Sequence, residues 1–66
     1  MNKTIKDLLD TVYRVTDKTD LLSNGVKCTV FRVYKRSGDS FVYDGQWSCP
    51  GHGKSDYQCL KAYLDE

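Results

Sequence analysis

The sequence predicts a small single α+β domain in which a helix, a two-stranded antiparallel β-hairpin and a second helix follow one another. Three observations indicate this order: an amphipathic segment over residues 4–15, two β-prone runs at 26–36 and 40–48 around a turn, and a helix-capping pattern ahead of residues 55–65. A chain of 66 residues has room for one domain, so we expect residues 1–66 to form it. Such a domain buries only about 60% of the surface that its unfolded chain exposes, so a metal, a disulfide or a bound partner would add stability.

The first predicted helix spans residues 4–15. Thr4 and Asp7 have the spacing of a capping box. Apolar side chains then recur every three or four residues, as on one face of a helix: Ile5, Leu8, Leu9, Val12 and Tyr13. A competing interpretation is that residues 11–16, which are rich in β-branched side chains, form a third strand after a shorter helix.

The hairpin is the strongest structural signal. Gly38 and Asp39 suit a two-residue turn, which predicts a register in which Cys28 lies opposite Cys49 and Val30 opposite Trp47. Because side chains alternate along a strand, one face then carries the larger aromatic set. We expect that face to be the core and Leu21 and Leu22 to close its edge. Asn24-Gly25 is expected to form a turn or a helix C-cap. The aromatic residues concerned are Tyr34, Phe41, Tyr43 and Trp47.

The last predicted helix begins after Ser55. Ser55 and Gln58 repeat the capping-box spacing, and the helix is expected to end near Asp65. Its core-facing stripe consists of Cys59, Leu60, Tyr63 and Leu64.

Between Ser48 and Cys59 lie two of the three cysteines, the only histidine and the only proline. In CPGHG, Cys49 and His52 stand three residues apart across a turn, which is the spacing of a zinc knuckle. These five residues resemble the C-P-x-C-G turn of rubredoxin-like and zinc-ribbon sites, with His52 in the place of the second cysteine. Since Cys28 is expected opposite Cys49, the hypothesis is a structural zinc ion with four ligands: Cys28, Cys49, His52 and Cys59.

Three other interpretations of the same residues stay open. The simplest has the thiols as small buried side chains and the loop as a turn before a helix, with no cofactor. A disulfide between Cys28 and Cys49 is a second, although three cysteines are too few for a secreted disulfide framework and indicate a reducing compartment. The third is catalysis by the Cys49 thiol with His52 as its base. Because the sequence shows no group to orient such a pair, we expect no enzyme.

Charge and hydropathy leave the partner class open. Ten basic and nine acidic residues give a net charge of +1, so no strong overall field attracts nucleic acid or lipid. The segment MNKTIKDLLD holds no apolar run long enough for the core of a signal peptide, and no segment has membrane-spanning length. A soluble cytoplasmic protein is therefore the expectation.

The function expected from these observations is binding or regulation by association with a protein partner. Pairing of two copies through an unpaired strand edge would be one form of such association. The alternative is a zinc-stabilised nucleic-acid-binding module that uses the basic and aromatic hairpin. Its candidate contact residues are Lys27, Arg32, Lys35, Arg36, Tyr34, Tyr43 and Trp47.

Overall fold

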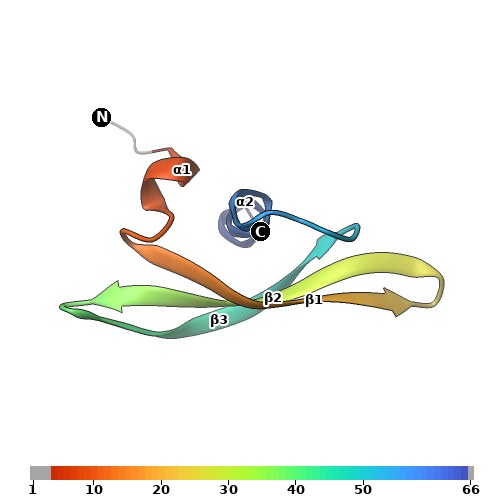
Figure 1. Ribbon diagram of the computed structural model, residues 1–66, viewed down its shortest axis with the longest axis horizontal. Coiled ribbons are helices and arrows are strands. Elements are labelled where there is room, and N and C mark those ends of the chain that lie inside the picture. Colours follow the sequence, from red (N-terminus) through yellow and green to blue (C-terminus); the bar gives the residue numbers. More distant parts are fainter. Residues whose placement is uncertain (1–3, 66) are drawn as a thin grey trace.

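The computed structural model describes residues 4–65. In chain order its elements are α1 (Ile5–Leu8), β1 (Tyr13–Ser23), β2 (Val26–Ser37), β3 (Ser40–Pro50) and α2 (Asp56–Leu64). The strands form one antiparallel sheet in the order β1-β2-β3, and both helices lie on the same side of it (Figure 1). The α+β class is confirmed, and so is the strand that residues 11–16 suggested, which is present as β1.

The helix predicted over residues 4–15 is wrong beyond its first turn. Its capping box is confirmed: the Asp7 amide donates to Thr4 Oγ1 at 3.2 Å, and the Thr4 amide donates to Asp7 Oδ2 at 3.3 Å. The chain leaves the helix at once, and Asp10 adopts a left-handed φ of 65°. The β-branched residues that follow favour a strand, and pairing with β2 buries Val15, which a longer helix would not achieve.

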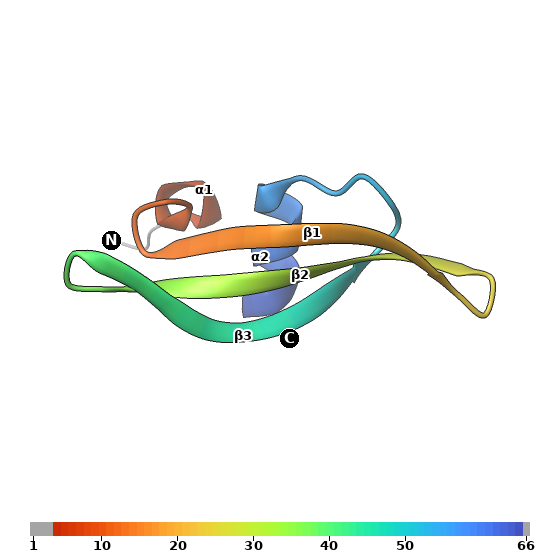
Figure 2. The same cartoon turned by 60° about the horizontal axis from the view of Figure 1, so that its bottom comes forward.

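Both hairpin turns form at the predicted positions. Asn24 and Gly25 have φ values of 53° and 78°, as a type I′ turn between β1 and β2 requires. Gly38 has a φ of 62° at the first of two loop positions between β2 and β3, as in a type II′ turn. The prediction that Leu21 and Leu22 close the core edge is wrong. Both are exposed on the β1–β2 arm, which extends beyond α2 (Figure 2).

A bulge in β3 changes which side chains share a face. Next to the turn, Tyr34 lies opposite Tyr43, in agreement with the predicted register. The following pair is Val33 with Gly45, so Asp44 has no partner on β2. One extra residue in a strand reverses the alternation of all that follow.

Beyond the bulge, the predicted pairs Cys28–Cys49 and Val30–Trp47 are wrong. The observed pairs are Cys28 with Pro50, Thr29 with Cys49, Val30 with Ser48 and Phe31 with Trp47. Directly opposed residues share a face, so Cys28 and Cys49 lie on opposite faces of the sheet. Trp47 likewise lies on the face of Phe31, and not on that of Val30 as predicted.

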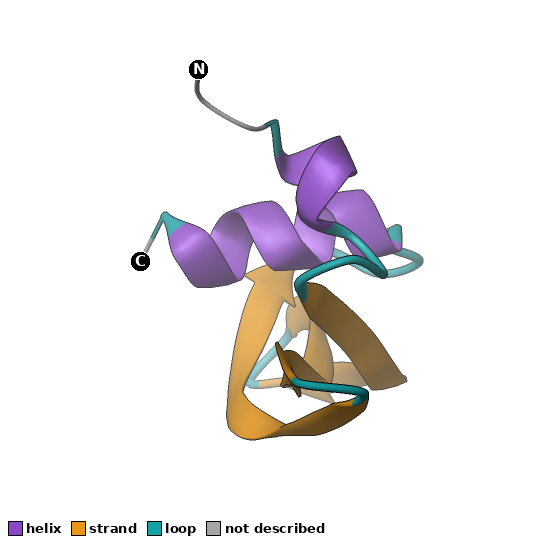
Figure 3. Ribbon diagram, turned by 90° about the vertical axis from the view of Figure 1, so that its left-hand side faces the viewer, coloured by secondary structure: helices purple, strands orange, loops and turns teal. Residues whose placement is uncertain are grey.

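The core lies between the sheet and α2. Its buried side chains are Val15, Phe31, Val33, Cys49, Cys59 and Leu60. The expectation that the aromatic face forms the core is therefore wrong, and Tyr43 is 56% exposed. Trp47, on the core side but on an edge strand, is 42% exposed. Figure 3 shows both helices stacked on one side of the strands. Neither helix, within residues 4–65, is long and apolar enough to cross a membrane.

Candidate functional site

The sheet face turned away from the helices is the candidate site, and we call it the open face. Figure 2 looks onto this face, with α1 and α2 behind the sheet. No helix in the described part of the chain covers it. The strand registers place on it, with others, Arg14, Thr16, Leu21, Val30, Arg32, Tyr34, Arg36, Phe41, Tyr43 and Gln46.

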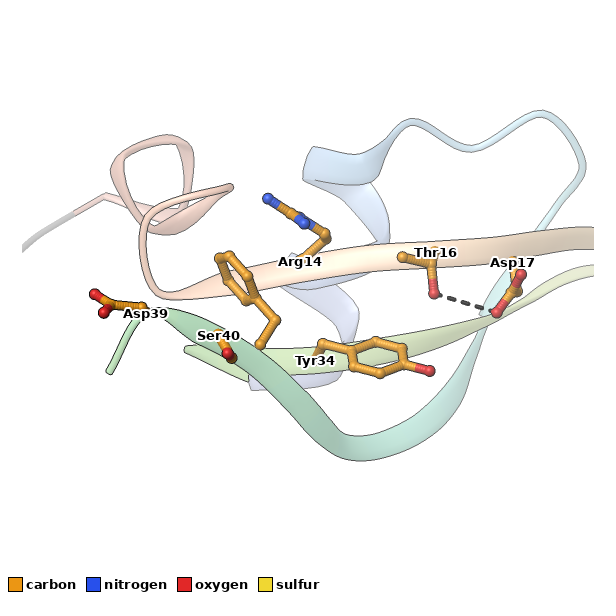
Figure 4. Close-up of a pocket in the computed structure, with 7 residues that line it drawn as sticks. Arg14, Thr16, Asp17, Tyr34, Asp39 and Ser40 are labelled. Atoms are coloured by element: carbon orange, nitrogen blue, oxygen red, sulfur yellow. Dashed lines mark hydrogen bonds between the residues drawn. The ribbon is translucent and has the colours of Figure 1, made fainter. Parts of the chain in front are cut away.

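A shallow groove of about 690 Å³ lies on the part of the open face nearest the β2–β3 turn. Asp39 and Asp17 mark its two ends, with Tyr34 between them (Figure 4). The lining residues are Arg14, Thr16, Asp17, Tyr34, Asp39, Ser40 and Phe41.

Stacking contacts order the aromatic rings of the open face. The rings of Tyr34 and Tyr43 meet edge to face, with centroids 5.7 Å apart and an interplanar angle of 77°. The guanidinium carbon of Arg14 lies 4.1 Å from the centroid of the Phe41 ring. Such a cation–π contact holds both side chains in a defined position.

Each arginine of the open face meets an oxygen of its own chain. Arg14 Nε lies 3.6 Å from an Asp10 carboxylate oxygen, and Arg32 Nη1 lies 3.7 Å from Asp17. Arg36 instead donates to two backbone carbonyls, from Nε to Gly38 at 3.1 Å and from Nη1 to Thr11 at 3.5 Å. The positive charge of the face is thereby partly balanced by groups beside it.

The contact residues predicted for nucleic acid divide between the two faces. Four of them share the open face: Arg32, Tyr34, Arg36 and Tyr43. Lys27, Lys35 and Trp47 belong to the helix side, where Lys35 Nζ lies 5.9 Å from the ring of Tyr13. The sequence prediction omits Arg14, because a helix over residues 4–15 would remove it from the sheet. The β-branched residues at 11–16 are the signal that places a strand there.

The CPGHG segment is fastened to the β1–β2 arm through Asp20. The carboxylate of Asp20 accepts from the Gly53 amide at 3.1 Å and from the Thr29 hydroxyl at 3.0 Å. The same hydroxyl lies 2.8 Å from the Gly51 carbonyl oxygen. The bond from Gly53, followed by that from Thr29, lowers the pKa of Asp20. These contacts make the segment a structural connection between the end of β3 and the arm.

His52 also contacts the arm. Its Nε2 lies 2.8 Å from the carbonyl oxygen of Leu21. A carbonyl oxygen can only accept, so Nε2 carries the proton in this bond. The only histidine of the chain is thus held against β1 by this bond.

The four predicted zinc ligands do not converge. Within residues 4–65, no group of three or more His, Cys, Asp or Glu side chains lies close enough together to hold a metal ion. Cys28 lies on the open face, whereas Cys49 and Cys59 are buried on the helix side. All three thiols are free, and burial raises the pKa of Cys59. The described cysteines therefore show neither the predicted disulfide nor the geometry of the zinc hypothesis.

No family model, curated protein or solved structure matches the chain.

Proposed function

We propose that the protein is a non-enzymatic binding module that holds a protein partner on its open face. One observation supports this most directly: three aromatic rings and three arginines lie on a sheet face that no described helix covers. Tyrosine, phenylalanine and arginine are enriched at protein interfaces, where tyrosine and arginine supply much of the binding energy. Lysine and glutamate are depleted there, and the registers place neither on the open face.

The size of the sheet indicates how strong such an association would be. β1 and β3 each have 11 residues, which extend to about 36 Å at roughly 3.3 Å per residue. Three strands about 4.8 Å apart then present roughly 500 Å², or about 1,000 Å² over both partners. Specific stable complexes bury about 1,200–2,000 Å². A transient partner is therefore expected.

Single-stranded nucleic acid is the second candidate. It is favoured by the alternation of aromatic rings and arginines, since bases stack on rings while arginines contact phosphates. The charge balance favours protein instead. Arg14 and Arg32 each lie beside a carboxylate of their own chain, and Asp39 lines the same groove. The phosphates of a nucleic acid would have to compete with these carboxylates for the arginines.

Site-specific photocrosslinking tests the proposal. A benzophenone amino acid replaces Tyr43 on the open face or, as a matched control, Tyr57 on α2, where the tyrosine is 45% exposed. In cells that make the protein, position 43 should give one defined protein adduct and position 57 none. The adduct is identified by mass spectrometry and its partner purified. Tyr34→Ser should then weaken binding by about tenfold.

Three results would contradict this function. Equal adducts from positions 43 and 57 would show no preference for the open face. Unchanged binding by Tyr34→Ser would remove the aromatic groove from the interface. Tight, salt-dependent binding of oligouridine or oligothymidine, lost in Tyr34→Ser, would assign the face to nucleic acid. An adduct of two copies of the chain would identify the partner as a second copy. The cytoplasm remains the proposed location, because all three thiols are free.

A further inference from the structure

We propose that the partner segment presents an acidic side chain to a subsite formed by Arg14 and Arg36 around the Phe41 ring. We call these three residues the arginine subsite. This inference rests on the proposed function, because it names the chemistry of the partner on the same face.

Arg14 is prepared to receive a carboxylate. Its guanidinium carbon lies 4.1 Å from the Phe41 ring centroid, which restrains the orientation of the group. Its contact with Asp10 is 3.6 Å long, and both side chains are exposed. An exposed pair of this length contributes little, so a partner carboxylate can replace Asp10. The planar guanidinium can then donate two parallel hydrogen bonds to it.

Arg36 is held in place by its own backbone and side-chain bonds. Its amide donates to the Val12 carbonyl at 2.7 Å, and its guanidinium donates to Gly38 and Thr11. A guanidinium has five N–H donors, so these two bonds leave three for a ligand. Arg36 therefore needs little reordering to bind an anion.

The sheet register brings the two arginines onto one end of the open face. Arg36 lies directly opposite Phe41, and Arg14 lies directly opposite Tyr34. Arg14 and Arg36 are therefore diagonal neighbours, about 7–8 Å apart at the backbone, which is within reach of long side chains. One carboxylate between them can contact both guanidinium groups.

The surroundings favour one acidic residue over a row of phosphates. Asp39 lines the same groove as Arg14 and Phe41. Asp39 would repel a second anion at the turn end of the groove. On the other side, the rings of Tyr34 and Tyr43 offer apolar surface. The complementary segment is therefore an acidic residue followed closely by an aromatic or aliphatic one.

Selection from a random peptide display library tests this inference. Phage are selected on the immobilised protein, and those that also bind the Tyr34→Ser variant are removed. The enriched peptides should share an Asp or Glu beside an apolar residue. For a synthetic peptide of that sequence, Arg14→Gln should weaken binding by about tenfold. Arg14→Lys, which keeps the charge but lacks the planar group, should weaken it as well.

A double-mutant cycle with the synthetic peptide identifies the contact. Changing the acidic residue of the peptide to its amide should weaken binding about as much as Arg14→Gln does. The two changes together should weaken binding little more than either one alone. Arg32→Gln is the matched control, because Arg32 lies beyond Tyr34 from Arg36 and pairs with Asp17. It should have a smaller effect.

The failure of this inference differs from the failure of the proposed function. If the selected peptides depend on Tyr34 but lack an acid, or bind Arg14→Gln equally well, the inference is overturned and the open-face function remains. If no selected peptide depends on Tyr34, both are overturned.

Discussion

The hydroxyl of Tyr63 donates a hydrogen bond of 2.6 Å to Asp44, the unpaired residue of the β3 bulge. This bond joins α2 to the residue at which the alternation of β3 reverses. The neighbouring Gly45 leaves room for it, since a Cβ there would lie 2.5 Å from Tyr63 Oη. Tyr43, before the bulge, lies on the open face, and Trp47, after it, lies on the core side. The composition of the open face thus depends on this bulge.

Removal of this hydrogen bond should destabilise the fold modestly. Tyr63→Phe is expected to lower the free energy of unfolding by about 1 kcal/mol, which is typical of a hydrogen bond between side chains. Asp44→Ala removes the acceptor and serves as the partner variant, since an asparagine oxygen could still accept from the hydroxyl. In denaturant titrations, the double variant should lower the free energy of unfolding little more than either single variant does. Fully additive costs would show that the two groups act independently.

The same bond predicts a pH dependence at the alkaline end. The hydrogen bond to Asp44 is the main cause that raises the pKa of Tyr63 from 10.0 to about 12. Above pH 10 the unfolded chain loses this proton while the folded chain keeps it, so folding becomes less favourable up to about pH 12. The stability difference between the wild type and Tyr63→Phe should therefore be constant below pH 10 and decrease above it. A constant difference from pH 8 to 11.5 in denaturant titrations would contradict the assignment.

Local features of the fold could be predicted from the sequence. The capping boxes at Thr4 and Ser55 and the turns at Asn24-Gly25 and Gly38 form where expected, because each depends on side chains a few residues apart. The predicted first helix is too long, because apolar residues at helical spacing outweigh the β-branched residues after Thr11. Pairing with β2, a long-range effect, decides in favour of the strand.

The candidate site was less predictable, because it depends on the bulge. The bulge lies at a tertiary contact, because Gly45 leaves room for Tyr63 of α2, which is distant in the sequence. Without the bulge, a regular hairpin would place Cys28 opposite Cys49, which is the pairing on which the zinc and disulfide predictions depend. The prediction that Tyr34 and Tyr43 share a face with Arg32 is confirmed. Which face α2 covers required the structure.

Core and open face should respond differently to truncation. Phe31 is fully buried, and Phe31→Ala is expected to lower the free energy of unfolding by about 3–5 kcal/mol. Tyr43→Ser, on the open face, should lower it by about 1 kcal/mol or less, including the lost edge-to-face contact with Tyr34. Denaturant titration of both variants measures the difference. A large loss in Tyr43→Ser would mean that the open face is part of the core.

The three thiols should react at different rates. Cys28 is half-buried, whereas Cys49 and Cys59 are buried, and the raised pKa of Cys59 disfavours its thiolate. Maleimide labelling followed by mass spectrometry should show one faster modification, at Cys28, and two that require unfolding. Since the predicted zinc ligands do not converge, a strong chelator should leave the unfolding midpoint unchanged. Release of one zinc ion per chain with loss of stability would contradict this.

The open face as the binding surface is tested most directly by comparing two tyrosines on opposite sides of the molecule. Tyr43 is 56% exposed on the open face, and Tyr57 is 45% exposed on α2. The measurement is the dissociation constant of the crosslinked partner, once purified, for Tyr43→Ser and Tyr57→Ser, with the free energy of unfolding of each. We predict about tenfold weaker binding for Tyr43→Ser alone, with both variants close to the wild type in stability. Equal binding by the two variants, or a loss confined to Tyr57→Ser, would contradict the account.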